Sequence, residues 1–385
     1  MNAKVSLSHQ SAAVLLGLCC VAMLTVASAN ATAATQADEF QADPATGSGS
    51  VIVHPQLGGQ ILGYDVDRNG TEGLLSEYVS LGNGNNNVAT ETFDLKTGKI
   101  LKVVAKTLNT IDDYVTQGIF QHVGLVLYQH GAQNDFQNDF LTINPLSSGK
   151  FNGKWTPPIK KNYQLWTTSV SPEGMANIAA FQLSNDVGNT TAYIFSSNVV
   201  ANTFGPQIRF AADRLTLLAY DSKTNQAVLA FTSTIHAAIE TIDLTSGKKR
   251  SFKTVGFGAV QGLAVDSASG TACITLLGSP FTPPTVEFYD LAKQTGFAVN
   301  MPGLNVGLDV EFDHIHKLFL VAETDFVNSG ILVYDENGSL KETIPVQELP
   351  VSPSLIALNP SKRIGFVPVI VEPQHEFLEL QSFRY

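Results

Sequence analysis

Cysteine, tryptophan and basic residues are all scarce in this chain. Of its three cysteines, Cys19 and Cys20 lie close to the amino terminus and Cys273 stands alone in the rest of the sequence. The main body therefore has no internal disulfide available, and a large domain can do without one if its core is big enough. Acidic residues outnumber basic ones, with a formal net charge of −11. No stripe of Lys and Arg stands out, which argues against a nucleic-acid partner.

Long apolar runs are also absent, except at the start. Lys4 lies in a short polar segment, residues 12–26 are apolar, and residues 27–29 are the small residues Ala-Ser-Ala. This order is typical of a cleaved signal peptide, here residues 1–29. A retained membrane anchor is the alternative, although the run is short for a span of about 20 residues. We therefore expect a periplasmic or secreted protein, of bacterial type, whose mature chain has no transmembrane segment.

Residues 30–49 are rich in Ala, Thr, Gly, Ser, Gln and Asp. This composition is typical of disorder, and we interpret the segment as a lead-in to the folded part. Residues 50–385 then form one repetitive body, which is the part of the sequence that carries the information about the fold.

One short pattern recurs along this body: an alternating apolar strand that ends in a polar residue and is often followed by a turn with glycine. The copies are 45 to 52 residues apart. Their last polar residues are Asp94, Asn144, Ser196, Asp243, Asp290, Asp335 and Gln381. Asp and Asn side chains bond their own backbone in turns, and Gly supplies positive φ.

A second turn series runs out of phase with the first. Residues 221–225 (Asp-Ser-Lys-Thr-Asn) and residues 266–270 (Asp-Ser-Ala-Ser-Gly) are its clearest members, and each precedes an apolar strand. Two turns in fixed order within a period of about 45 residues predict four short strands per unit. The fold class is therefore all-β, a seven-bladed β-propeller. A β-sandwich or a solenoid is the alternative architecture.

The last unit lacks its outer strand, because the chain stops at Tyr385 soon after Gln381. An unused apolar strand, Val51-Ile52-Val53, precedes the first unit. We predict that this strand completes the seventh blade and closes the ring, since the last blade would otherwise expose an open edge.

The blades resemble those of the YVTN and lactonase-like propellers of the WD-like repeat superfamily. Residues 355–366 (LIALNPSKRIGF) are similar to the strand-turn-strand consensus of that group, and Val333-Tyr334-Asp335 is similar to the strand that follows. The resemblance covers residues 50–385 at the level of the blade. It implies the propeller fold and makes a lactonase-type hydrolase an alternative function. No catalytic motif of the lactonases matches residue by residue.

In a propeller, loops between the second and third strands of each blade share one face with the loops that join blades, and binding sites gather there. We call this the loop-rich face. Candidate ligand-binding residues in these loops are Asn134, Asp135, Asn138, Asp139, Asp112 and Asp113. Asp135 and Asp139 are also candidate Ca²⁺ ligands, because Ca²⁺ prefers several oxygen ligands. The competing interpretation is that such residues simply form turns.

Catalysis, if present, would use histidine and acids on the same face. The candidates are His236 and His375 with Glu372 and Asp325, as bases or metal ligands. His314 and His316 have metal-ligand spacing, but they fall in a turn on the opposite face and are predicted to be surface residues. Cys273 lies mid-strand and is predicted to be a core residue.

The sequence thus predicts a non-catalytic, exported and monomeric propeller that binds a small molecule or a protein on its loop-rich face. The alternatives are a lactonase-like hydrolase, with or without a metal, and a structural envelope component. No cofactor is identified beyond the possible Ca²⁺.

Overall fold

The computed structural model describes residues 50–385, except for short gaps at 57–58, 81–85, 109–113, 131–136, 185, 187–188, 213–214, 233–236, 279–281, 303–304, 326, 351–355 and 373–376. The predicted signal peptide and lead-in lie outside the described residues. No helix in the described part of the chain has the length and apolarity needed to cross a membrane.

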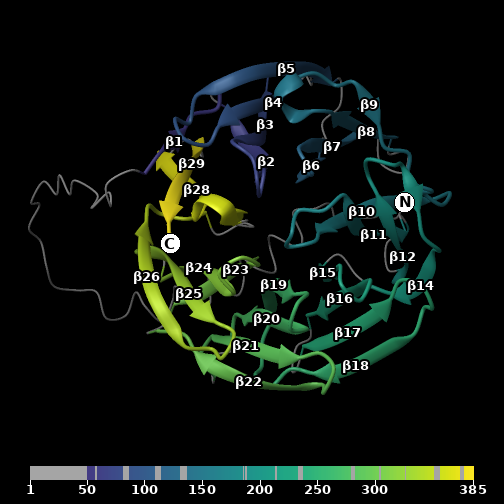
Figure 1. The fold of residues 1–385 in the computed structure, drawn as a ribbon, viewed down its shortest axis with the longest axis vertical. Helices are drawn as coiled ribbons and strands as arrows, with labels where there is room; N and C mark the ends of the chain where they lie inside the picture. Colours follow the sequence, from purple (N-terminus) through teal and green to yellow (C-terminus); the bar gives the residue numbers. More distant parts are fainter. Residues whose placement is uncertain are drawn as a thin grey trace, which may run out of the picture. The chain divides into compact units, whose positions relative to one another are not determined.

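The strands form seven antiparallel sheets arranged as blades around a ring (Figure 1). In blades 1 to 6 the first strand is innermost and the chain moves outward, whereas the outermost strand of blade 7 is β1. The prediction of a seven-bladed propeller is therefore confirmed.

The first three blades contain the following strands. Blade 1 comprises β2 (Gln60–Val66), β3 (Glu72–Ser80), β4 (Asn86–Asp94) and β5 (Ile100–Leu108). Blade 2 comprises β6 (Tyr114–Phe120), β7 (Val123–His130), β8 (Gln137–Ile143) and β9 (Gly153–Lys154). Blade 3 comprises β10 (Tyr163–Val170), β11 (Asn177–Ser184), β12 (Thr191–Asn198), β13 (Thr203–Phe204) and β14 (Ile208–Ala211).

The other four blades are more regular. Blade 4 comprises β15 (Leu217–Asp221), β16 (Gln226–Phe231), β17 (Ala238–Asp243) and β18 (Lys249–Lys253). Blade 5 comprises β19 (Val260–Asp266), β20 (Thr271–Leu276), β21 (Thr285–Asp290) and β22 (Thr295–Asn300). Blade 6 comprises β23 (Val306–Asp313), β24 (Leu318–Thr324), β25 (Ser329–Asp335) and β26 (Leu340–Val346). Blade 7 comprises β27 (Ala357–Asn359), β28 (Ile364–Glu372), β29 (Phe377–Arg384) and β1 (Ile52–Val53).

Blade 3 departs from the four-strand pattern, because its outer strand is split into β13 and β14, which both pair with β12. Gly205 and Pro206 lie between the two pieces. Proline has no N–H to donate to a ladder, so an outer strand is interrupted where it occurs.

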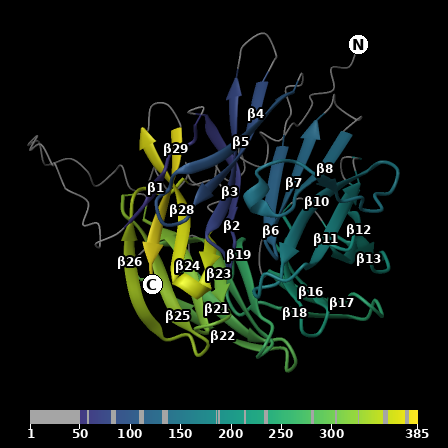
Figure 2. The same ribbon diagram turned by 45° about the horizontal axis from the view of Figure 1, so that its top comes forward.

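The ring closes as predicted. β1 pairs with β29 in the register Ile52 with Gln381 and Val53 with Leu380, and the two strands lie side by side in both ribbon views (Figures 1 and 2). Beyond them, the backbone N–H of Ser382 donates to the carbonyl oxygen of Val51 over 2.8 Å. The Val53 side chain is completely buried. Strands from the two ends of the described chain therefore share one sheet.

The turn residues act as their chemistry predicts. In the turn after β4, the Asp94 carboxylate accepts hydrogen bonds from the backbone of Lys96 (3.1 Å) and Thr97 (2.8 Å). Gly98 then adopts a φ of 69°. Asp243 and Gly247 repeat this arrangement in blade 4. The local Asx bonds and the left-handed glycine explain why the pattern recurs in the sequence.

The core consists of seven apolar clusters, one between each pair of neighbouring blades. Between blades 5 and 6, for example, the Phe312 and Phe319 rings lie 4.6 Å apart and Phe288 packs on Phe319 at 5.6 Å. Cys273 is fully buried in the same cluster, so its predicted core position is confirmed. Sheets packed face to face in this way share one continuous core around the ring.

Buried acids and amides within the strands hold the connections between blades. The Glu287 carboxylate of β21 accepts hydrogen bonds from the backbone N–H groups of Val255 and Gly256. Gln182 of β11 receives one from Lys160 over 2.7 Å, and Glu91 of β4 receives one from Gln56 over 3.1 Å. Each side chain satisfies backbone donors that would otherwise be buried without partners.

Candidate functional site

Most of the residues predicted for the loop-rich face lie outside the described residues. These are His236, His375, Asn134, Asp135, Asp112 and Asp113. Asn138 and Asp139 belong to β8, where their backbones pair with Gln129 and Tyr128. Glu372 ends β28 and pairs with Phe377. The predicted ligand and catalytic groups on this face therefore remain predictions, and so does the Ca²⁺ site.

Asp325 is the one predicted site residue whose side chain is described. Its carboxylate accepts hydrogen bonds from the backbone N–H groups of Val327 (2.8 Å) and Asn328 (2.5 Å). These bonds hold the Asp325 pKa below its usual value. The side chain thus shapes its own turn. Within the described ranges, no three or more His, Cys, Asp or Glu side chains gather as a metal site would need.

The opposite face is described completely. It is formed by the turns between the first and second strands of the blades, which we call the first turns. The first turns are residues 67–71, 121–122, 171–176, 222–225, 267–270, 314–317 and 360–363. They surround the inner ends of the blades and form the channel mouth on this side.

Polar contacts join the first turns of blades 7, 1, 2 and 3. The Asn359 side-chain amide donates to the carbonyl oxygen of Asp67 over 2.6 Å. The Asp67 carboxylate in turn pairs with the His122 ring. The Gln121 backbone N–H donates to the carbonyl oxygen of Gly174 over 3.1 Å. Each contact crosses from one blade to the next, so the turns are positioned relative to one another.

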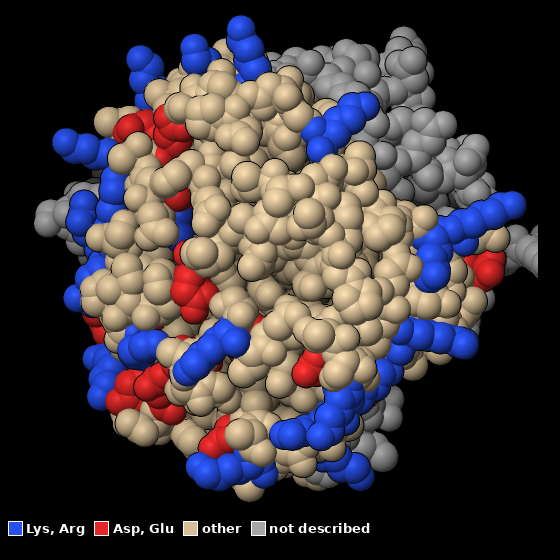
Figure 3. Space-filling view, turned by 45° about the vertical axis from the view of Figure 1, so that its right-hand side comes forward, with Lys and Arg blue, Asp and Glu red and all other residues tan. Residues whose placement is uncertain are grey.

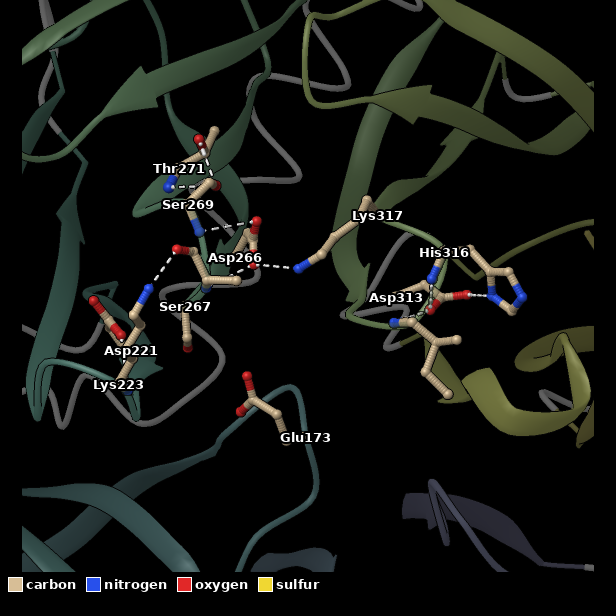
Figure 4. Close-up of polar contacts among 12 residues, drawn as sticks. Glu173, Asp221, Lys223, Asp266, Ser267, Ser269, Thr271, Asp313, His316 and Lys317 are labelled. Carbon is tan, nitrogen blue, oxygen red and sulfur yellow. Dashed lines mark hydrogen bonds and ion pairs between the residues drawn. The ribbon is translucent and has the colours of Figure 1, made fainter.

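The contacts continue through blades 3 to 6, and Figure 4 shows those made by Lys223 and Lys317. The Ser222 hydroxyl donates to the Glu173 carboxylate over 2.8 Å, and the Lys223 ammonium donates to the carbonyl oxygen of Ala268 over 2.8 Å. The Lys317 ammonium donates to the Asp266 carboxylate over 3.2 Å.

Between blades 6 and 7 the link lies deeper, where the Ile356 backbone N–H donates to the Asp309 carboxylate over 2.8 Å. Together with the contacts of the first turns, it completes the circle. Every neighbouring pair of blades is therefore joined by a polar contact at or below this mouth.

Arg68 crosses the axis of the ring. It belongs to the first turn of blade 1, yet its guanidinium donates to the carbonyl oxygen of Pro172 in blade 3 over 3.2 Å and to the Glu311 carboxylate in blade 6. Blades 3 and 6 lie two places away on either side of blade 1, so the side chain must run through the centre. Its side chain is only 9% exposed. The channel is thus filled by a paired arginine at this level.

Burial around this arginine changes the acidity of its neighbours. Burial raises the Asp65 pKa to about 6, although the Arg68 charge opposes the rise. The pKa of Asp309 is also raised by burial. The Tyr64 hydroxyl lies buried with no partner among the described residues, and burial together with Asp309 and Asp65 raises its pKa. The channel interior beneath the first turns is therefore poor in solvent and rich in carboxyl groups.

His314 and His316 do not form a metal pair. β23 ends at Asp313, so both histidines lie in the turn instead of on one side of a strand. The His316 ring binds the Asp313 carboxylate over 2.7 Å. His314 faces the axis instead, where burial and then the Arg68 charge lower its pKa. Its Nδ1 atom is buried and has no hydrogen-bond partner in the described part of the chain.

Five residues thus converge on the axis at this mouth: Arg68, Glu173, Glu311, His314 and Lys317. We call them the axial cluster. In the close-up, Glu173 extends from its turn toward the space bounded by Ser267 and Lys317 (Figure 4). The cluster offers an uncharged imidazole nitrogen beside a carboxylate that has one described hydrogen-bond donor. This combination can accept hydrogen bonds from an ammonium or guanidinium group.

Outside the axial cluster, one face of the molecule has a wide area without charged side chains. In the space-filling view, Lys and Arg side chains project mainly around the outline and a broad central area carries neither kind of charge (Figure 3). The acidic groups at the mouth include a further carboxyl pair, Asp266 and Glu336. A hydrogen bond to Asp266 raises the Glu336 pKa to about 7.

The first turns can be recognised in the sequence, but the contacts that they make across the axis cannot. Residues 67–70 (Asp-Arg-Asn-Gly) have the composition of an ordinary turn, and nothing local marks Arg68 as a residue that reaches two other blades. The signal in the sequence was an arginine at a turn position that the other blades fill with Gln, Pro, Ser or His.

Comparison with known proteins supports the fold alone. No protein-family model matches the sequence, and no curated protein matches it either. Solved propeller structures are similar in shape. A chain of the mitotic checkpoint complex superposes with a TM-score of 0.56 at 14% identity, covering 92% of this chain and 97% of that one.

Two further structures give similar values. The Dos1 propeller has a TM-score of 0.55 at 10% identity, covering 87% of this chain and 94% of that one. The propeller domain of Cps50 (Swd1) from Myceliophteria thermophila has a TM-score of 0.55 at 10% identity, covering 87% and 99%. At this identity the likeness supports the β-propeller fold and nothing finer.

Proposed function

We propose that this chain is an exported, non-catalytic propeller that binds a ligand or partner carrying a cationic nitrogen group at the mouth formed by the first turns. The axial cluster is the observation that carries this proposal. Its acceptors are fixed by contacts between blades, so binding would require little reorganisation. Propellers commonly serve as interaction scaffolds, which agrees with this role.

The charge balance favours a cationic ligand. Arg68 is already paired with Glu311, and Lys317 is paired with Asp266. Glu173 receives one described hydrogen bond, from Ser222. An added ammonium would therefore meet a carboxylate with spare acceptor capacity, and the neutral His314 ring beside it would not repel the charge.

A thermal-shift and calorimetric screen tests the proposal. The probes are spermidine and arginine amide, added to the mature protein at low ionic strength. We expect both to bind wild type, and the Glu173→Gln variant to bind about tenfold more weakly, which corresponds to about 1.4 kcal/mol. Gln keeps an acceptor for Ser222, so the turn itself is preserved.

Glu342→Gln is the matched control, since Glu342 is exposed on the outer strand β26. It removes the same charge far from the axis and should leave binding unchanged. The proposal would be contradicted if both substitutions weakened binding equally, or if wild type bound neither probe. Loss of binding in His236→Ala or His375→Ala, with Glu173→Gln unaffected, would move the site to the loop-rich face.

A lactonase-like hydrolase, with or without a metal such as Ca²⁺, is the second candidate function. It rests on the resemblance of the blades to the YVTN and lactonase-like group, with His236, His375, Glu372 and Asp325 as the residues to test. Hydrolysis of a lactone panel with and without Ca²⁺ and Zn²⁺ would favour it if the activity disappears in His236→Ala. A structural envelope role would give neither hydrolysis nor ligand binding.

Export to the periplasm or beyond is part of the same proposal and rests on residues 1–29. The amino-terminal sequence of the protein isolated from its source tests it directly, because cleavage by signal peptidase would leave Asn30 first. Sedimentation of the mature chain tests the proposed monomer.

A further inference from the structure

A groove of about 380 Å³ lies beside the closing strand, between blade 7 and blade 1. It is separate from the channel. Its lining residues are Val51, Leu95, Lys96, Lys362, Ile364, Ser382 and Arg384. They come from the strand that closes the ring, from the turn after β4, from the first turn of blade 7 and from the end of β29 (Figure 1). The volume falls within the range of small-molecule sites.

Three cations surround this groove, and no carboxylate lines it. Lys96, Lys362 and Arg384 are all exposed, and none of the three forms an ion pair within the described residues. Hydrogen bonds from Thr97 and Lys96, and then the charge of Lys362, lower the pKa of the neighbouring Asp94. Its carboxylate is occupied by the backbone and hydroxyl of Thr97. The groove is therefore a positively charged site on a protein whose formal net charge is −11.

A buried hydroxyl provides a second indication of a ligand. Ser382 is only 4% exposed and lines the groove. Its oxygen accepts a hydrogen bond from the Val51 backbone N–H over 2.6 Å. The hydroxyl keeps a hydrogen that it can donate into the groove. An oxyanion in the groove would offer an acceptor for this hydrogen.

We propose that this groove binds a small multivalent oxyanion, either a phosphate compound or a polycarboxylate. Its oxygens would accept hydrogen bonds from Ser382 and approach the ammonium and guanidinium groups of the lysines and Arg384. The apolar side chains of Val51, Leu95 and Ile364 would cover part of a carbon skeleton. Three cations are too few for a nucleic-acid backbone, which needs a longer positive stripe.

Titration calorimetry with pyrophosphate and with citrate tests the inference on the full mature chain. We expect at least one of them to bind wild type, and the identity of the better ligand separates the phosphate source from the carboxylate source. Lys362→Gln and Arg384→Gln should each weaken binding several-fold, and the double variant at least tenfold. Lys253→Gln is the control, because Lys253 is exposed on the outer strand β18 and forms no ion pair among the described residues.

Both substitutions in the groove replace exposed side chains, and a thermal melt of each variant verifies that the blade remains folded. If a variant melts early, protection of wild-type Lys96 and Lys362 from acetylation by pyrophosphate or citrate, read by mass spectrometry, gives the same answer without mutation. Binding of neither anion, or equal weakening by the Lys253 control, would overturn the inference. Because the axial cluster is untouched by these changes, spermidine binding reports on the proposed function independently.

Discussion

The guanidinium of Arg68, from the first turn of blade 1, donates a hydrogen bond to the carboxylate of Glu311 in blade 6. The Arg68 side chain is 9% exposed and that of Glu311 is 25% exposed. Blade 7 lies between these two blades, so the pair ties together strands that share no ladder. The same guanidinium also holds the Pro172 carbonyl of blade 3.

Replacement of Arg68 by Met should destabilise the propeller by about 3 kcal/mol, because it leaves the Glu311 carboxylate and the Pro172 carbonyl without their donor. Urea unfolding monitored by tryptophan fluorescence measures the loss. The double variant Arg68→Met with Glu311→Leu should recover part of it. If Arg68→Met is as stable as wild type, the contact across the axis contributes nothing.

Stability should fall as the pH rises toward 8, because of a buried carboxyl pair in blade 1. Glu77 and Glu91 are completely buried. Burial, and then the neighbouring Glu77, raises the Glu91 pKa from 4.5 to about 8. The folded state therefore binds this proton more tightly than the unfolded state does. The stabilisation that the Glu91 proton contributes to the folded state is complete below about pH 4.5 and is lost as the pH rises through 8.

The Glu91→Gln variant should lose this part of the pH dependence while keeping an acceptor for the Gln56 backbone. Melting temperatures of wild type and variant from pH 5 to pH 9 measure the effect. As the pH rises, the melting temperature of the variant should increase relative to that of wild type. Glu342→Gln provides the control at an exposed position. Parallel curves for wild type and Glu91→Gln would contradict the assignment.

Truncating the closing strand should weaken the whole ring. Val53 is fully buried in the cluster between blades 7 and 1, so Val53→Ala should cost about 2 kcal/mol. Ile52→Ala, one residue earlier at a half-buried position, should cost less. Chemical denaturation of both variants gives the comparison. Equal effects would indicate that β1 contributes only backbone pairing.

Cys273 should be unreactive in the folded protein. Burial raises the pKa of its thiol, and only the thiolate attacks disulfide reagents. We expect Ellman's reagent to label it at the rate of global unfolding, with rapid labelling in urea. Rapid labelling under native conditions would show that the cluster between blades 5 and 6 opens locally.

The sequence allowed the fold to be predicted because its information is local and repeated. Each of the two turns, at Asp94 and at Asp243, is specified by residues that lie within about five positions along the chain. Period-two alternation defines the strands between such turns. Closure by Val51-Ile52-Val53 followed from counting strands. The split outer strand of blade 3 was not anticipated, although Pro206 carried the signal.

The site could be predicted far less well, because its contacts are not local. Arg68 and Glu311 are separated by 243 residues, and only ring closure brings them together. Strand acids such as Glu91 and Glu287 have the alternation of solvent-facing residues, yet they are buried against the connections between blades. A sequence pattern indicates which side of a strand a residue occupies, but not whether a loop covers that side.

The closing strand also determines how the ring would respond to a pulling force. Any tension on the chain ahead of residue 51 reaches the propeller through the short pairing of Ile52 and Val53 with β29 and the hydrogen bonds between Val51 and Ser382. This pairing joins two residue pairs, whereas the neighbouring ladder between β28 and β29 joins eight. Under load the ring should therefore part beside β29 while all other blades stay folded, and the groove of Lys96, Lys362 and Arg384 would lose one wall at that moment. An anion bound there would therefore oppose the separation of β1 from β29 under load.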